Sequence, residues 1–302
     1  MFVFQKQIMM RRVLYSLIPI FLFSIYLYGW RVLAIGAVVF TAGILTEYLF
    51  MKQRKQKVSE AVLVSCALYT LSMPPIVPLW IAAIGIIFGV LFGKSIYGGF
   101  GRNVFNPAIT GRLFIYITFP TIMTGGWMLP GNWGTLGADA VTSATPLEMM
   151  RVGNTPPLMD LLSGFRMGAL GESAIILILL AAVYLIYTKT ASWKSILSTV
   201  VSFLILQSIL FYTGIIAAPP LESLLAGSVL FIAVFMVTDP ISSAKKPLGQ
   251  VLYGIVVGVS LALIRDFSLF PEGASFAILM GNMFAPLLDE LAVKLKKKAV
   301  KK

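Results

Sequence analysis

The sequence contains no histidine and a single cysteine, Cys66, and only 12% of its 302 residues are charged. Imidazole and thiolate groups are the usual protein ligands of haem, zinc and iron-sulfur clusters, so no such metal site is predicted for this chain alone. Cys66 lies in an apolar run and is expected to be a small buried residue. Because 58% of the residues are hydrophobic, the chain cannot bury its apolar groups in one soluble core and needs lipid around it.

The charges that are present are unevenly split, with 24 lysines and arginines against 12 aspartates and glutamates and a formal charge of +12. In a soluble protein such an excess is typical of nucleic-acid binding. Here the basic residues stand in short clusters between apolar runs, where they act as membrane topology signals. No nucleic acid partner is therefore predicted, and membrane lipid is the partner expected of the apolar runs.

Apolar runs suited to crossing a bilayer recur along the chain, since each crossing needs roughly 20 mostly apolar residues. The runs lie approximately at 13–28, 31–51, 58–73, 76–93, 104–123, 172–188, 193–213, 221–238, 249–265 and 273–292. They predict an all-α polytopic membrane protein of about ten transmembrane helices. The Met73-Pro74-Pro75 turn is expected to divide the third helix from the fourth, because prolines remove backbone donors and stop a helix.

A short internal repeat divides these helices into halves. Residues 103–109 (NVFNPAI) are echoed by 282–288 (NMFAPLL), and each half has an acid after a threonine, at Glu47 and Asp239. Five helices per half predict two inverted five-helix repeats, and a chance echo is the alternative. The predicted units are 1–123 (first membrane half), 124–171 (extracytoplasmic loop), 172–293 (second membrane half) and 294–302 (basic cytoplasmic tail).

The lysines and arginines orient this arrangement, because those in short loops are retained on the cytoplasmic side. With the N-terminus inside, twenty of the 24 fall on inner segments, and the four on outer segments are Arg31, Arg151, Arg166 and Arg265. Both termini are thus predicted to be cytoplasmic, with the loop 124–171 outside. The expected location is a prokaryotic cell (inner) membrane, crossed many times.

The outer loop contains the sequence GADAVTSATPL at 137–147. By composition it is a turn-forming, solvent-facing stretch, and an ordinary loop is the simplest interpretation. It nevertheless resembles the acidic, hydroxyl, small, Ala-Thr motif at which flavin transferases join FMN through its phosphate to a threonine. The residues that match are Asp139, Thr142, Ser143, Ala144 and Thr145. Ser143 departs slightly from the motif, because many relatives have glycine there.

A second motif, GGFGRNVFNPAITGR at 98–112, resembles the signature of the membrane subunits shared by Rnf electron-transport complexes and sodium-pumping NADH:quinone reductases. The sequences TDP at 238–240, KPLG at 246–249 and EGASFA at 272–277 resemble the same family, so the likeness spans nearly the whole chain. Within this RnfD/NqrB family, the chain is more similar to the RnfD type than to the NqrB type of the reductases, since it lacks the longer N-terminal extension of the latter.

The resemblance implies a subunit of an ion-translocating ferredoxin:NAD oxidoreductase, which moves Na⁺ or H⁺ and is not active as this chain alone. It implies FMN bound covalently to Thr145 as an electron relay, with a noncovalent riboflavin or FMN as a further possibility. The implied partners are other membrane, flavin and iron-sulfur subunits, and a flavin transferase for maturation. Thr145 is then a tether with an exposed hydroxyl on a flexible loop, and no residue is predicted to be catalytic.

Four residues near the second motif are further candidates for flavin or phosphate contacts: Arg102, Asn103, Asn106 and Arg112. The predicted topology puts both arginines on the inner side, away from the attachment loop unless the segment re-enters the membrane. Positive-inside anchoring is their alternative role. The asparagines, together with Asn282, suggest interrupted helices whose free backbone groups line a cavity suited to a second flavin.

Glu47 and Asp239 are predicted at helix ends near the inner interface, where an acid costs less than at the bilayer centre. They either belong to an ion pathway or pair with Arg54 or Lys245, and the structural pairing is favoured. The Gly-xxx-Gly-xxx-Gly spacing at 85–93 predicts close helix packing.

A channel or transporter of the ammonium or urea type is the alternative function, because inverted five-helix halves also describe those proteins. The lack of histidine argues against the ammonium type, whose pore resembles a paired-histidine design. A channel also has no use for an attachment motif at 139–145.

Overall fold

The computed structural model describes residues 4–131, 145–268 and 273–300. Within these ranges the regular secondary structure is almost entirely helical, and β1 (Phe4–Gln5) pairs with β2 (Val58–Ser59) as a short parallel strand pair. Five of the described helices are long and apolar enough to cross a membrane: α1 (Ile8–Tyr28), α2 (Arg31–Gln53), α10 (Trp193–Tyr212), α13 (Pro247–Phe267) and α14 (Gly273–Val300). The protein is an all-α polytopic membrane protein, as predicted.

Residues 4–131, as described, contain six α-helices and one π-helical turn: α1 (Ile8–Tyr28), α2 (Arg31–Gln53), α3 (Ala61–Leu71), α4 (Leu79–Val90), η1 (Leu91–Ser95), α5 (Pro107–Thr118) and α6 (Pro120–Gly125). The predicted break at residues 73–75 lies between α3 and α4. The span expected at 104–123 begins later and is divided between α5 and α6, because Pro120 cannot donate the backbone hydrogen bond that would continue α5.

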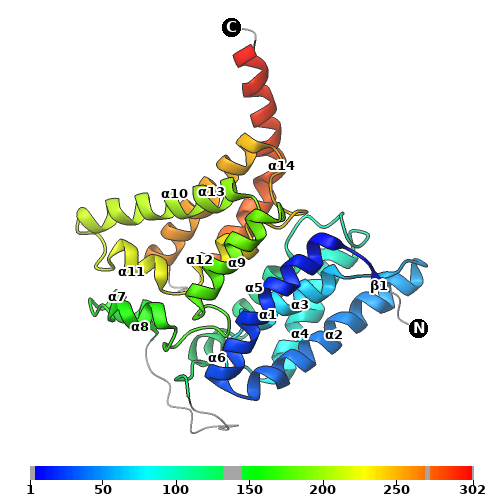
Figure 1. Ribbon diagram of the computed structural model, residues 1–302, viewed down its shortest axis with the longest axis horizontal. Coiled ribbons are helices and arrows are strands. Elements are labelled where there is room, and N and C mark those ends of the chain that lie inside the picture. The colour runs from blue at the N-terminus through cyan, green and yellow to red at the C-terminus, as the bar shows by residue number, and fades with distance from the viewer. Residues whose placement is uncertain (1–3, 132–144, 269–272, 301–302) are drawn as a thin grey trace.

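The described residues from 145 onward contain eight α-helices: α7 (Pro146–Arg151), α8 (Leu158–Ser163), α9 (Ile175–Tyr187), α10 (Trp193–Tyr212), α11 (Pro220–Leu225), α12 (Val229–Phe235), α13 (Pro247–Phe267) and α14 (Gly273–Val300). The region expected to be a loop, 124–171, thus carries the short helices α7 and α8. The span expected at 221–238 is two short helices, and the basic tail continues α14 as far as Val300 (Figure 1).

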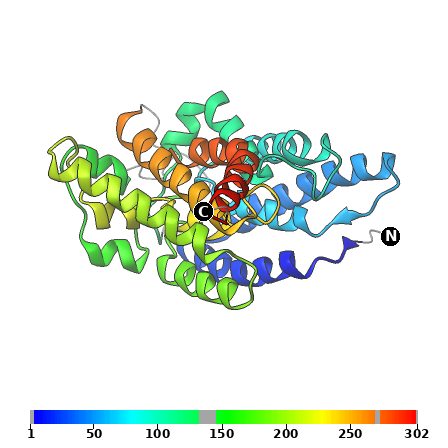
Figure 2. The same cartoon turned by 90° about the horizontal axis from the view of Figure 1, so that it is seen from above.

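Helix contacts follow the same order in both halves. Helix α4 packs against α2 and α5, and its counterpart α13 packs against α10 and α14. Likewise, α1 packs against α3 as α9 packs against α12. The halves lie side by side and meet where α1 contacts α9 and α5 contacts α14 (Figures 1 and 2). The helix contacts of the two halves thus correspond, and the two inverted five-helix repeats stay a prediction.

Glycine allows the closest of these helix contacts. A Cβ atom on Gly89 would lie 2.3 Å from the carbonyl oxygen of Pro107, and one on Gly85 would lie 2.0 Å from the hydroxyl of Tyr69. In the second half, a Cβ on Gly258 would lie 2.4 Å from the carbonyl oxygen of Thr199. Small residues therefore bring α4 against α5 and α13 against α10, and the close packing predicted for residues 85–93 is confirmed.

Candidate functional site

Thr145 is the N-cap residue of α7. The backbone N–H of Glu148 donates to Thr145 Oγ1 at 3.3 Å, and the backbone N–H of Thr145 donates to Glu148 Oε2 at 2.8 Å. The local sequence Thr-Pro-Leu-Glu accounts for this reciprocal capping box, and proline suits the first helical position. The threonine hydroxyl also donates to Glu148 Oε2 at 3.1 Å.

The expectation of an exposed hydroxyl at Thr145 is therefore wrong for the chain as it stands. The residue is only 9% exposed, because the cap holds its side chain against the start of α7. The other residues of the attachment motif lie outside the described residues. They are Asp139, Thr142, Ser143 and Ala144.

Thr145 lines a small cavity of about 40 Å³. Its wall combines charged side chains of both signs with aromatic rings. The principal members besides Thr145 are Arg112, Tyr116, Trp127, Glu148, Glu172 and Arg265. A cavity with buried guanidinium groups suits an anionic ligand such as a phosphate, because Arg presents planar, charge-assisted donors.

Arg112 does not lie where the predicted topology put it. Its side chain is 1% exposed, lines the Thr145 cavity and has Nη2 3.5 Å from Glu172 Oε1. Helix α5 begins at Pro107, inside the body of the protein, so Arg112 lies about 8 Å further along the helix axis on the side of Thr145. Arg112 and Thr145 therefore line one cavity, which the predicted topology allowed only for a segment that re-enters the membrane. Arg102 is exposed and lines a different opening.

Arg265 reaches the same cavity from the last turn of α13. Its Nη1 donates to the carbonyl oxygen of Ser223 at 2.8 Å and to that of Ala226 at 3.3 Å, and its guanidinium stacks on the ring of Phe203. The side chain is 4% exposed. These contacts fix a second cation beside Thr145, at a residue that the sequence identified only as an outer basic residue.

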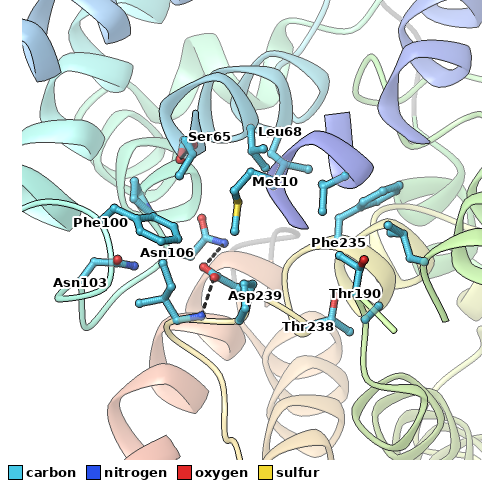
Figure 3. Close-up of a pocket in the computed structure, with 18 of the residues that line it drawn as sticks. Met10, Ser65, Leu68, Phe100, Asn103, Asn106, Thr190, Phe235, Thr238 and Asp239 are labelled. Atoms are coloured by element: carbon cyan, nitrogen blue, oxygen red, sulfur yellow. Dashed lines mark hydrogen bonds between the residues drawn. The ribbon is translucent and has the colours of Figure 1, made fainter. Parts of the chain in front are cut away.

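A second cavity, of about 50 Å³, lies between the two halves (Figure 3). Asn103 and Asn106 line it, as predicted for the residues before α5, and Asp239 faces them from the segment after α12. Asn106 Nδ2 donates to Asp239 Oδ2 at 3.3 Å, while Asn106 Oδ1 accepts from the backbone N–H of Ala108 at 3.0 Å and so caps α5. Figure 3 shows Phe100 and Phe235 on opposite sides of Asp239.

Asn282 joins this network but does not interrupt its helix. Its Oδ1 accepts from the backbone N–H of Asn106 at 3.1 Å, and its Nδ2 donates to the hydroxyl of Tyr253 at 2.9 Å. Helix α14 continues through Asn282 and Pro286, so only the first of the two echoed motifs marks a helix start. Asn106 and Asn282, one from each of the two echoed segments, are thus joined by a hydrogen bond.

Glu47 forms a buried ion pair with a partner that was not expected. Lys94 Nζ lies 2.7 Å from Glu47 Oε2 and 2.6 Å from Ser59 Oγ, and Ser59 Oγ donates to Glu47 Oε1 at 2.7 Å. The π-helical turn η1 carries Lys94 to this position, so the proposed pairing with Arg54 is wrong. Asp239 likewise accepts from Asn106 and Ser242 rather than pairing with Lys245.

The Glu47–Lys94 pair separates the second cavity from a third, polar opening. Lys94 lines the second cavity, whereas Glu47, Ser59 and Arg102 line the third, and Phe100 borders both. The charges that a flavin or an ion would meet in the second cavity are therefore one ammonium and one carboxylate, from Lys94 and Asp239.

Comparison with known proteins gives consistent matches over nearly the whole chain. The model of the NQR2, RnfD, RnfE family matches residues 4–298. The chain is 36% identical over 274 residues to the NqrB component of the Na(+)-translocating NADH-quinone reductase of Azotobacter vinelandii, covering 86% of this chain and 66% of the relative. It is 37% identical over 267 residues to the same component from Chromohalobacter salexigens, covering 86% and 65%. The chain thus spans slightly less than two thirds of the length of these relatives.

Proposed function

The chain belongs to the NQR2, RnfD, RnfE family, and from this we propose that it is a flavin-carrying membrane subunit of a redox-driven ion pump. The pump transfers electrons through several subunits and moves Na⁺ or H⁺, and this chain has no complete activity alone. The family membership favours a redox subunit over a channel of the ammonium or urea type. The observation that carries the proposal furthest is the placement of Thr145, Arg112 and Arg265 around one cavity.

In this proposal FMN is attached to Thr145 through its phosphate, and the flavin supplies the redox chemistry when bound. Arg112 and Arg265 balance the charge of the phosphate, and Glu172 holds Arg112 in position. Trp127 and Tyr116 supply flat apolar surface for a ring system. Thr145 serves as a tether. The flavin transferase recognises the segment that contains Asp139, Thr142, Ser143 and Ala144.

The second cavity is proposed to hold a noncovalent riboflavin or FMN. Asn103, Asn106 and Asp239 supply convergent polar groups there, as the polar contacts of a small-molecule site would require. Helix α5 lines both cavities, with Asn106 at its start and Arg112 six residues on, a separation of about 9 Å along the helix axis. The two flavins would therefore lie one after the other along α5, so that an electron could pass from one to the other.

We propose ferredoxin and NAD as the electron partners, from the likeness to the RnfD type. The names of the relatives favour NADH and a quinone instead. Reduction of the membrane-bound assembly by reduced ferredoxin, compared with reduction by NADH, separates the two alternatives. The remaining subunits are of membrane, flavin and iron-sulfur type. They supply the iron-sulfur clusters, which this chain, with one cysteine and no histidine, is not expected to bind.

The experiment is in-gel fluorescence of the chain produced together with its flavin transferase. A denaturing gel removes noncovalent flavin, so a fluorescent band reports the covalent bond. Thr145→Ala loses both the hydroxyl and the cap and should be dark. Thr145→Asn keeps a capping oxygen but has no hydroxyl, so it should fold and remain dark, whereas Thr145→Ser keeps both and should fluoresce.

A dark wild-type band, while the transferase modifies a known acceptor, would refute the covalent flavin. Fluorescence that persists in Thr145→Asn would move the attachment site to Thr142 or Ser143. Purified membranes that still contain riboflavin or FMN after Thr145→Asn would support the second cavity, and loss of that flavin in Asn106→Ala would locate it there.

A further inference from the structure

Helices α10 and α13 begin side by side and run in the same direction. At their starts, Ser192 Oγ donates to Gln250 Oε1 at 2.7 Å. Further along, Gly254 and Gly258 of α13 lie directly against Ser198 and Ser202 of α10. The two helices therefore pack closely on their inner side, and their outer sides border a groove of about 830 Å³.

The wall of this groove is strongly apolar. From α10 it includes Leu197, Val201, Ile205 and Ile209, which are 42–55% exposed, and from α13 it includes Ile255, which is 40% exposed. Side chains of this kind on the outside of a membrane protein face acyl chains or another membrane segment.

One end of the groove is cationic. Lys194 and Trp193 line it there, with Lys194 Nζ 5.9 Å from the centroid of the Trp193 ring. Lys245 and Lys246 are exposed directly before Pro247, which also lines the groove. Tryptophan and lysine at such a position are typical of the membrane interface, where the headgroups lie.

The nearest acid does not cancel these charges. Asp289 of α14 accepts hydrogen bonds from the backbone N–H groups of Lys245 and Lys246, both at 2.8 Å, and so engages the backbone at the start of α13. Three lysine ammonium groups therefore face one carboxylate at this end of the groove.

We propose that this groove binds one anionic phospholipid, with an acyl chain along the apolar wall and the phosphate beside Lys194, Lys245 and Lys246. Basic pockets between membrane helices on the cytoplasmic side recognise anionic headgroups through the same charge complementarity. A partner helix could fill the apolar wall but would leave three ammonium groups without counter-charge. This lipid site is independent of the proposed flavin attachment.

Native mass spectrometry of the purified full-length chain tests the site, with phosphatidylglycerol and phosphatidylcholine of the same acyl chains as probes. The wild type should retain phosphatidylglycerol preferentially. The variant Lys194→Gln/Lys245→Gln/Lys246→Gln should lose that preference by roughly ten-fold or more, because each lysine near an anionic lipid contributes about a factor of five. The matched control, Lys296→Gln/Lys297→Gln/Lys298→Gln, removes the same charge from the tail and should keep the preference.

Filling the groove supplies a second test that leaves the lysines in place. Val201→Trp should reduce retention of phosphatidylglycerol while in-gel flavin fluorescence stays at the wild-type level. Equal retention of both lipids by the wild type, or an equal loss in the tail control, would overturn the proposal. So would efficient crosslinking of Val201→Cys, in a Cys66→Ala background, to a neighbouring subunit in the assembled complex, because a protein segment would then occupy the groove.

Discussion

The hydroxyl of Thr145 has two competing uses. In the chain as it stands it donates to the Glu148 carboxylate and accepts from the Glu148 backbone N–H, so it stabilises the start of α7. An ester oxygen keeps its lone pairs but has no hydrogen to donate. Attachment of a phosphate therefore requires the cap to open and places a negative charge beside Glu148.

This competition predicts that Glu148→Ala accelerates flavin attachment. Removal of the carboxylate costs the cap about 1 kcal/mol, which corresponds to roughly a five-fold larger open population. A time course of in-gel fluorescence with purified transferase should show a rate increase of that order. Glu222→Ala, which changes a first-turn glutamate of α11, is the control and should be unaffected. Slower attachment in Glu148→Ala would instead mean that this carboxylate accepts the hydroxyl proton.

The buried pair of Glu47 and Lys94 allows a second prediction at this scale. Glu47→Gln leaves the Lys94 ammonium buried without a counter-charge, which costs about 3–5 kcal/mol, whereas Glu47→Leu/Lys94→Met removes both charges and should recover most of the loss. Thermal stability in detergent, followed by size-exclusion chromatography, measures both. Lys294→Gln breaks the exposed Glu290–Lys294 pair and should have almost no effect. A stable Glu47→Gln variant would contradict the assigned pairing.

At the scale of elements, the approach of α4 to α5 positions both cavities, because α5 carries Asn106 at its start and Arg112 further along. A Cβ on Gly89 would lie 2.3 Å from the Pro107 carbonyl oxygen and 2.9 Å from the Gly111 nitrogen. Backbone atoms cannot move aside as a flexible side chain can, so any side chain at residue 89 must displace α5.

Gly89→Ala is therefore expected to destabilise the protein by about 1–3 kcal/mol, as overpacked cores do. It should also reduce the retention of both flavins. The matched control is Gly125→Ala in α6, where an added Cβ meets no atom within 4 Å. Thermal stability and flavin content of the purified protein provide the measurements. Equal behaviour of the two variants would show that α4 and α5 pack differently.

The elements also show what could be predicted from sequence. Hydropathy and prolines located a helix or helix pair for every expected span, since each run is long and bounded by breakers. The late start of α5 was missed because apolar residues such as Val104 and Phe105 extend the hydrophobic run through a segment that is not helical. Asn106 followed by Pro107 was the local signal for that start, an N-cap followed by proline.

The site was predicted less completely than the helices. Thr-Pro-Leu-Glu at 145–148 is a capping-box sequence, and it could have shown that the threonine is held at a helix start. The meeting of Arg112 with Glu172, and of Lys94 with Glu47, depends on contacts between residues 60 and 47 positions apart in the chain. Pairing at such distances is set by helix packing and leaves no periodic signal in one sequence.

At the scale of the whole molecule, two contacts fix the relation between the Thr145 site and the basic C-terminus. Arg151, in the last turn of α7, donates to the carbonyl oxygens of Arg265 and Ser268 at the end of α13. At the other end of α13, Asp289 of α14 engages the backbone of Lys245 and Lys246. Helix α13 is therefore flanked by the α7 site at its end and by the lysine-rich part of α14 at its start.

Helix α13 has 21 residues and is about 32 Å long, which matches the roughly 30 Å hydrocarbon layer. We therefore predict that the Thr145 site and the lysine-rich end of α14 lie on opposite sides of the membrane. Because the lysines are retained inside, we predict that Thr145 is outside, and electrons that enter from the cytoplasm have to cross the bilayer to reach its flavin.

Single cysteines in a Cys66→Ala background test this topology, with a membrane-impermeant maleimide as the label. Val152→Cys, beside α7 and 74% exposed, should react in intact spheroplasts. Lys296→Cys, in the exposed part of α14, should react only in inside-out vesicles, and Ile205→Cys, on the apolar face of α10, should react in neither. Labelling of Val152→Cys and Lys296→Cys from the same side would contradict the transmembrane placement of α13. Labelling with the two sides exchanged would keep that placement but reverse the orientation, and the flavin on Thr145 would then face the cytoplasm.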